Sequence, residues 1–206
     1  MTSDPHFFRH KVRLAIGVGA ILLSLASHAT LDQAVSSTQS FGIDDYRQLA
    51  ESGDVEAMYN LGVIYSRGMG VEQSFVESLK WHRLAAEKGL VIAMRSVAIR
   101  YEKGEGTQKS YIVASEWYKR AALLGDFASM NNLASMYSKG QGVEQDLAMA
   151  YAWVTLAVEV SSSDPDARAY LDTYILNKKR ANALLNEAGR MHASQLVEKL
   201  RQHIRY

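Results

Sequence analysis

Residues 55–90 read VEAMYNLGVIYSRGMGVEQSFVESLKWHRLAAEKGL, and the same pattern returns at 91–126 and at 127–162. Equivalent residues stay 36 positions apart, without drift, through all three units. The recurring residues are Met58, Met94 and Met130; Tyr65, Tyr101 and Tyr137; Gly68/Gly70, Gly104/Gly106 and Gly140/Gly142; and Trp81, Trp117 and Trp153. A period of this length predicts a solenoid of repeated supersecondary units.

Each unit predicts two helices joined by a tight turn. Apolar residues at steps of three and four, from Ala57 to Tyr65, mark the buried stripe of a first helix. We expect Gly68 to end that helix, because glycine enters the left-handed region without a Cβ clash. The position that can cap the second helix holds Ser74, Ser110 and Asp146 in the three units. Since no strand pattern is present, the expected fold is all-α, an α-solenoid of antiparallel helix pairs with eight or nine helices.

The pattern A-x-x-x-L-G-x-x-Y-x-x-G-x-G-V, then A-x-x-W-x-x-x-A-A-x-x-G, resembles the Sel1-like repeat, a relative of the tetratricopeptide repeat. Unit one supplies Ala57, Leu61, Gly62, Tyr65, Gly68, Gly70, Val71, Trp81, Ala85, Ala86 and Gly89. Unit two departs from it at Val97, Ala98 and Thr107. The resemblance covers 45–160 and implies a scaffold that binds other proteins.

Residues 1–29 have the three-part plan of a secretory signal peptide. A basic flank precedes an apolar run at 14–25, and Ser27 and Ala29 fit a cleavage site before Thr30. The run is shorter than the roughly 17–25 residues that span a bilayer. We therefore expect a periplasmic or secreted protein of a Gram-negative cell. An uncleaved signal, anchoring the chain in the inner membrane, is the alternative.

The rest of the chain divides by composition and pattern. We expect a linker at 30–44, a repeat array at 45–162 that opens with a half unit at 45–54, and a C-terminal helical cap at 163–206.

The predicted cap contains two helices. Asp164 and Pro165 fit the start of one helix, and Asn177 can cap a final long one. The expected apolar line of that last helix is Leu184, Ala188, His192, Leu196, Leu200 and Ile204. Residues 178–206 hold seven Lys/Arg and two Glu. They form either a solvated cap or a basic contact surface for an acidic partner or anionic lipid.

The sequence contains few residues in the patterns that catalysis, metal binding or cofactor binding require. With no cysteine, the chain has no disulfide, thiolate nucleophile or cysteine metal site. His82 and His192 lack a second ligand at metal-binding spacing, and we expect His192, on the apolar line of the last helix, to pack in the core. The G-x-G elements follow a helix and lack the third glycine of the dinucleotide fingerprint. We therefore predict no catalytic residue, cofactor or metal.

Two classes of partner are also disfavoured. A net charge of +1 does not favour nucleic acid. Membrane contact is expected only through an uncleaved signal or the basic C-terminal helix.

A hydrolase acting on cell-wall-like substrates is an alternative function. The family members for which such an activity is claimed resemble a cysteine-rich branch, and this chain has no cysteine.

Binding is the expected function, through a concave surface lined by the first helices. The candidate residues are Tyr59, Asn60, Arg95, Ile99, Asn131 and Asn132. Arg95 is expected to hold an acidic group or the C-terminus of a partner protein in the cell envelope, with the asparagines bonding its backbone. A merely solvated inner face is one alternative, and a contact through Lys178, Lys179 and Arg180 is another.

Export is directly testable. Mass analysis of the protein recovered from the cell envelope should find a new N-terminus at Thr30, because Ser27 and Ala29 fit the signal-peptidase rule. An intact Met1 form in the membrane fraction would instead establish the anchored alternative.

Overall fold

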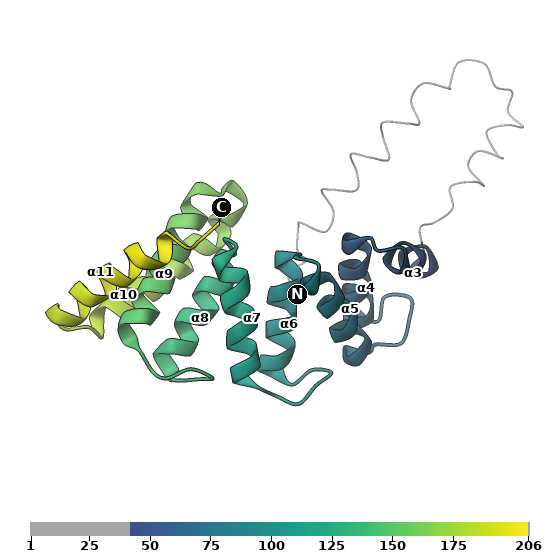
Figure 1. Ribbon diagram of the computed structural model, residues 1–206, viewed down its shortest axis with the longest axis horizontal. Coiled ribbons are helices and arrows are strands. Elements are labelled where there is room, and N and C mark those ends of the chain that lie inside the picture. Colours follow the sequence, from purple (N-terminus) through teal and green to yellow (C-terminus); the bar gives the residue numbers. More distant parts are fainter. Residues whose placement is uncertain (1–41, 206) are drawn as a thin grey trace, which may run out of the picture. The chain divides into compact units, whose positions relative to one another are not determined.

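The computed structural model describes residues 42–205, which form nine α-helices and a short 3₁₀ helix, with no strand in that range. The helices are α3 (Ile43–Glu51), α4 (Val55–Arg67), α5 (Phe75–Glu87), α6 (Val91–Lys103), α7 (Tyr111–Leu123), α8 (Phe127–Lys139), α9 (Leu147–Ser163), η1 (Pro165–Ala167), α10 (Arg168–Ala183) and α11 (Glu187–Arg201). Helices α3 to α9 follow one another in a row (Figure 1), and the predicted α-solenoid is confirmed. The predicted signal peptide and residues 30–41 of the predicted linker lie outside the described residues.

Within the repeats, the second helices are capped at the predicted Ser74, Ser110 and Asp146, and the first helix of unit one ends at the predicted Gly68. An N-cap oxygen accepts a hydrogen bond from the backbone N–H three residues on, which satisfies a donor that the first turn leaves open. The capping residues are Asp54, Ser74, Ser110, Asp126, Asp146 and Asn186. The first helices α4, α6 and α8 end at Gly68, Gly104 and Gly140, which all have left-handed backbones, with φ of 66°, 77° and 67°.

The second glycine of each turn has a further role, because it touches the preceding unit. A Cβ atom at Gly106 would overlap the backbone carbonyl of Phe75, and one at Gly142 would overlap that of Tyr111. The helix before Gly70 is α3, whose described part begins at Ile43, and among the described residues nothing lies within 4 Å of a Cβ placed at Gly70. The glycines therefore let each turn sit directly on the start of the second helix before it.

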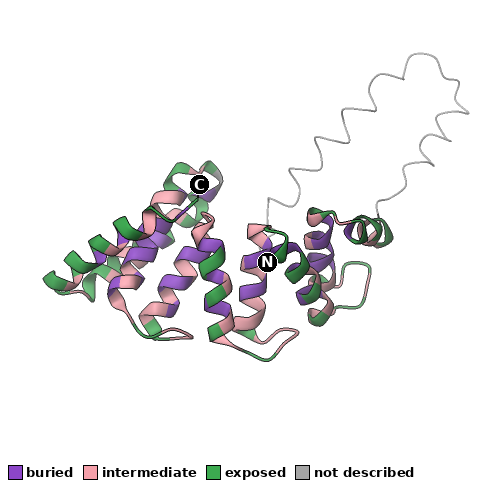
Figure 2. Cartoon of the chain, viewed as in Figure 1, coloured by how far each residue is buried: buried purple, intermediate pink, exposed green. Residues whose placement is uncertain are grey.

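Alanines let neighbouring helices approach closely along the array. Ala85, Ala86, Ala121, Ala122 and Ala157, all on second helices, are 0% exposed. Each helix from α3 to α9 packs against the next one in the chain. The buried residues form stripes along these contacts (Figure 2), so the hydrophobic core runs the length of the array.

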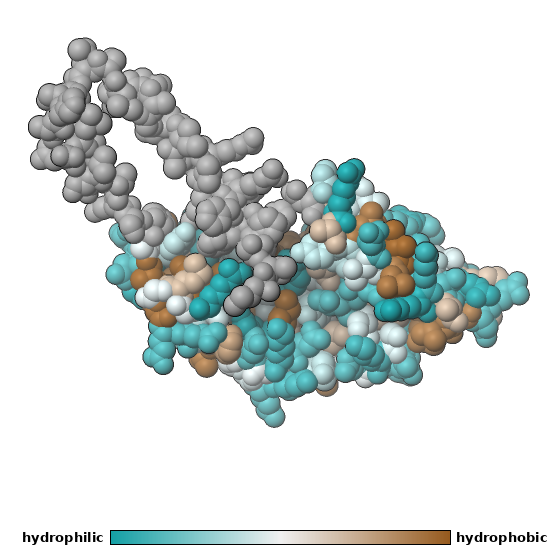
Figure 3. Space-filling model, turned by 180° about the vertical axis from the view of Figure 1, so that it is seen from behind, coloured by the Kyte–Doolittle hydropathy of each residue, from teal (hydrophilic) through white to brown (hydrophobic). Residues whose placement is uncertain are grey.

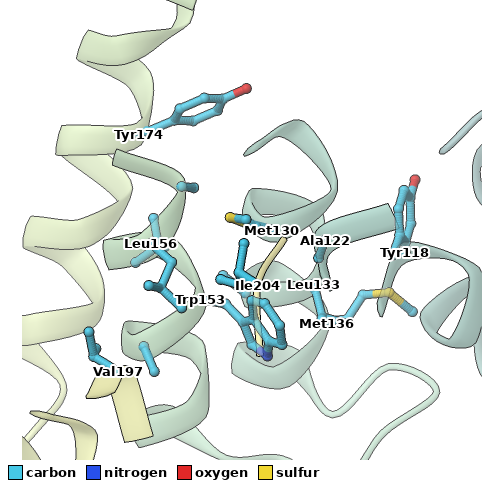
Figure 4. Close-up of a cluster of buried hydrophobic side chains, with 14 of the residues drawn as sticks. Tyr118, Ala122, Met130, Leu133, Met136, Trp153, Leu156, Tyr174, Val197 and Ile204 are labelled. Atoms are coloured by element: carbon cyan, nitrogen blue, oxygen red, sulfur yellow. The ribbon is translucent and has the colours of Figure 1, made fainter. Parts of the chain in front are cut away.

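Helix α9 is buried on nearly every side. The outer positions that hold Lys80 in α5 and Glu116 in α7 are exposed, whereas the equivalent Ala152 in α9 is fully buried. A helix that is apolar all round needs cover on every face. Helices α8, α10 and α11 all pack against α9, and Trp153 and Leu156 lie in one cluster with residues of the C-terminus (Figure 4).

The prediction of one long final helix capped by Asn177 is wrong. Asn177 lies inside α10, and this helix ends at Ala183. Asn186 caps the separate helix α11 by accepting a hydrogen bond from the Gly189 N–H at 2.8 Å. The turn between Ala183 and Glu187 changes the direction of the chain, so that α11 packs against α9. Pro165 begins the short 3₁₀ helix instead of an α-helix.

The apolar face of α11 is also shifted from the predicted line. Ala193 and Val197 are buried, whereas Ala188 and His192 are exposed, so the expectation that His192 packs in the core is wrong. The predicted Ile204 is buried at the end of this line, and Leu196 and Leu200 are half-buried, whereas Leu184 is exposed.

Polar contacts hold α11 and the segment after it against the array. The Arg201 guanidinium donates to both carboxylate oxygens of Glu159 on α9, at 2.9 and 3.0 Å. The Arg205 N–H donates to the Leu123 carbonyl at the end of α7, at 2.9 Å. The C-terminal segment therefore ties α9 to the unit before it.

The glycine contacts between units give a paired test by urea unfolding. Gly70→Ala should cost about 1 kcal/mol, the strain of an alanine in the left-handed region. Gly142→Ala should cost about 3 kcal/mol or more, because the turn must also move off the Tyr111 carbonyl. If both variants lost the same free energy of unfolding, the close contact between units would not be the reason for a glycine at position 142.

Candidate binding surface on the first helices

The six predicted binding residues all lie on the first helices, two each on α4, α6 and α8. Tyr59, Arg95, Ile99, Asn131 and Asn132 are half-buried. Asn60 is only 8% exposed, so it is not open to a partner in this structure. The other five remain predictions, and their neighbours decide what each can do.

Helix α10 continues the row of first helices. The Phe127 ring on α8 lies 6.0 Å from the Tyr174 ring on α10, and Tyr170 stacks on Tyr174 at 6.4 Å. The Asn177 side-chain amide donates to the Asn131 side-chain oxygen at 2.9 Å. The surface therefore extends beyond the three repeats, onto a helix that the sequence analysis placed in the cap.

Arg95 is engaged within the array. Its guanidinium donates to the Asp126 carboxylate at 2.6 Å, and the two side chains are 25% and 11% exposed. Asp126 also accepts the Ser129 N–H and so caps α8. A partner's carboxylate would have to compete with Asp126 for this cation, which weakens the case for Arg95 as the main anchor.

A second polar contact fixes the middle of the surface. The buried Tyr118 hydroxyl on α7 donates to the Glu102 carboxylate on α6 at 2.7 Å. Burial raises the pKa of Tyr118, the bond to Glu102 raises it further, and a hydrogen bond with Asn132 lowers it. Tyr118 therefore stays a neutral hydroxyl that orients Glu102.

In unit one, His82 fills the position that Tyr118 has in unit two. It is 2% exposed, and its ring lies 5.3 Å from the Tyr59 ring. A Cβ atom at Gly62 would overlap the imidazole, so that glycine makes room for it. His82 is therefore part of the buried interior of unit one. Burial lowers the pKa of His82 to about 3, the nearby charge of Arg100 lowers it too, and a hydrogen bond with the Tyr59 backbone opposes both.

Unit three leaves this space open as a pocket of about 340 Å³ between α8, α9 and α10. Val154 stands where the first two units have His82 and Tyr118, and Asn131 stands where they have Tyr59 and Arg95. The lining residues are Asn131, Ala134, Ser135, Ser138, Lys139, Ala150, Val154, Asn177, Arg180, Ala181 and Leu184. The smaller side chains of the third unit, Asn131 and Val154, are the sequence signal for this pocket.

The described residues suggest neither a metal centre nor a membrane span. In the range 42–205 no three His, Asp or Glu side chains are grouped as metal ligands would be. No helix in that range has both the length and the hydropathy to cross a bilayer. On the visible part of the array in Figure 3, hydrophobic side chains form separate groups among hydrophilic ones.

The fold and this surface define a class of protein, the α-solenoids built from antiparallel helix pairs. The Sel1 repeat model matches residues 55–90, 91–126 and 128–159, half of the chain. The chain belongs to the Sel1 repeat family, whose repeats are scaffolds for binding other proteins.

Two solved structures resemble the chain. A Sel1 repeat protein from Oxalobacter formigenes is 34% identical, with a TM-score of 0.54, over 64% of this chain and 97% of its own. The protein c5321, described as a protective antigen present in uropathogenic Escherichia coli strains with an SLR fold, is 29% identical, with a TM-score of 0.67. That match covers 79% of this chain but only 33% of c5321, so the chain spans a third of its length. A comparison with curated proteins finds no match.

The lowered pKa of His82 predicts a pH-dependent stability. A histidine with a pKa of about 3 when folded and about 6.5 when unfolded takes up its proton in the unfolded chain first. The free energy of unfolding should therefore fall as the pH drops from about 6.5 to about 3, by up to about 1.4 kcal/mol per pH unit from this group. Unfolding in urea at several pH values measures it.

Two variants isolate this contribution from that of the carboxylates. His82→Val, which copies Val154 of unit three, should flatten the pH dependence whatever its stability at pH 7. The exposed His192→Gln should keep the wild-type slope. An unchanged slope in His82→Val would contradict the assignment.

Proposed function

We propose that this protein is an exported, non-catalytic scaffold that binds a partner protein of the cell envelope through its first helices. The observation that carries the proposal is the row of accessible polar, aromatic and aliphatic side chains that continues from α4 to α10. Tyr59, Ile99 and Asn131 belong to it, and Tyr170 extends it onto α10. Solenoids present such a surface to extended segments of their partners.

The signal-peptide pattern of residues 1–29 supports the export part of the proposal, with the periplasm or the outside of the cell as the proposed location. If the signal stays uncleaved, the same array is an adaptor anchored in the inner membrane. The binding surface is the same in both cases, because it lies on the repeats and on α10.

The outer face of the array has a different character. The second helices expose charged side chains such as Lys80, Glu116 and Lys119, which are spread along α5 and α7. Lys80 lies over the Trp81 ring at 5.5 Å and is paired with Glu77 at 3.3 Å. These residues solvate the outer surface, and we assign them no partner.

Photo-crosslinking in the producing cells tests the surface. A benzophenone amino acid at Ile99, on the first-helix surface, should crosslink to the same discrete partner as one at Tyr59. The matched control at Glu116, on the outer face of α7, should give no such product. Crosslinking from Glu116 to that partner, or no product from either first-helix position, would contradict the proposal.

A further inference from the structure

The pocket in unit three has an unbalanced charge. Lys139 and Arg180 line it, and no Asp or Glu does. In the described part of the chain neither cation has a carboxylate partner, whereas Arg95, Arg100 and Arg201 are paired with Asp126, Glu105 and Glu159. Two uncompensated positive charges beside one small pocket favour an anionic group.

The wall between these cations supplies neutral hydrogen-bond donors. The Asn177 amide donates to the Asn131 oxygen, which leaves the Asn131 amide protons available. The Ser135 and Ser138 hydroxyls line the same space. Amides and hydroxyls can add bonds to a carboxylate that a cation holds.

The remainder of the pocket is apolar. Its residues are Ala134, Ala150, Val154, Ala181 and Leu184. Val154 is 1% exposed and Leu184 is 58% exposed, so the apolar wall runs from the floor of the pocket to its rim. A bare inorganic anion would leave this wall uncovered, whereas a ligand with an adjoining hydrocarbon group would bury it.

We propose that this pocket binds the C-terminal residue of a partner polypeptide, with its carboxylate between Arg180 and Lys139 and an apolar side chain against Val154 and Leu184. The volume of about 340 Å³ is at the lower end of ligand pockets, which suits one residue at a chain end. The inference rests on the proposed scaffold function and specifies which end of the partner is held, and where.

The probe is N-acetyl-leucine, which carries the carboxylate and the side chain of a C-terminal leucine. Its matched neutral form is N-acetyl-leucinamide, and N-acetyl-aspartate α-amide presents a side-chain carboxylate instead. Each is titrated into the ¹⁵N-labelled full chain. The side-chain amide signals of Asn131 and Asn177 report binding directly, because both residues line the pocket.

N-acetyl-leucine should shift both amide signals, and N-acetyl-leucinamide should bind at least ten-fold more weakly, because it lacks the charge. N-acetyl-aspartate α-amide should also bind more weakly, because it leaves the apolar wall uncovered. No shift with N-acetyl-leucine, or equal shifts with its amide, would overturn the proposal. Tighter binding of the aspartate derivative would replace the C-terminus with an acidic side chain and so overturn it as well.

Substitutions separate the pocket from general positive charge. Arg180→Gln should weaken N-acetyl-leucine binding about ten-fold, whereas Lys179→Gln, an exposed neighbour on α10 that does not line the pocket, should leave it unchanged. Equal effects would indicate a diffuse basic surface. Val154→Tyr, which copies Tyr118 of unit two, should fill the pocket and abolish binding. Ser135→Leu, on the half-buried rim, is a second blocking variant should Val154→Tyr not fold.

The pocket and the scaffold function fail separately. If crosslinking from Tyr59 and Ile99 captures the partner but Arg180→Gln leaves that capture and the N-acetyl-leucine titration unchanged, the pocket assignment is wrong and the scaffold function stands. If neither crosslinking position captures a partner, the scaffold function is wrong even where N-acetyl-leucine binds.

Discussion

The contact between each glycine turn and the helix before it sets the geometry of the whole array. Gly106 rests on the Phe75 carbonyl and Gly142 on the Tyr111 carbonyl, where no side chain would fit. Both contacts join equivalent positions of the 36-residue repeat, so each fixes one unit on its predecessor at the same place. Because every unit depends on its neighbour, the last unit needs a different cover, and α10 and α11 supply it.

The cover at the C-terminal end also creates the pocket. Helix α10 takes the place of a fourth first helix and closes one side of the space that Val154 leaves empty. Helix α11 then covers the outer face of α9 and is held there by the pair between Arg201 and Glu159. Arg180, from the basic segment, thereby lies at the same pocket as Asn131 of the third unit. Two alternatives that the sequence kept apart, the groove and the basic helix, meet at one place.

The repeats were predictable because three local signals recur every 36 residues: the apolar helix period, the turn glycines and the residue that caps the second helix. Each signal is present in all three units. The C-terminal region was not, because it has one copy and its helices pack by tertiary contact. Asn177 looked like a cap by type alone, yet it lies inside α10 and bonds Asn131 on α8. The sequence does hold one signal that further helices pack on the outer face of α9: Ala152 stands where α5 and α7 have the charged Lys80 and Glu116. The Arg95–Asp126 pair, 31 residues apart, had no local signal.

The account's central claim is that stability comes from neighbouring helices: among the described residues, α9 packs against three helices, whereas α3 packs mainly against α4. Amide hydrogen exchange measures this residue by residue. The slowest amides should lie in α9, with protection falling through α7 and α5 to α3. Uniform protection from α3 to α9, or protection in α3 as strong as in α9, would contradict the claim.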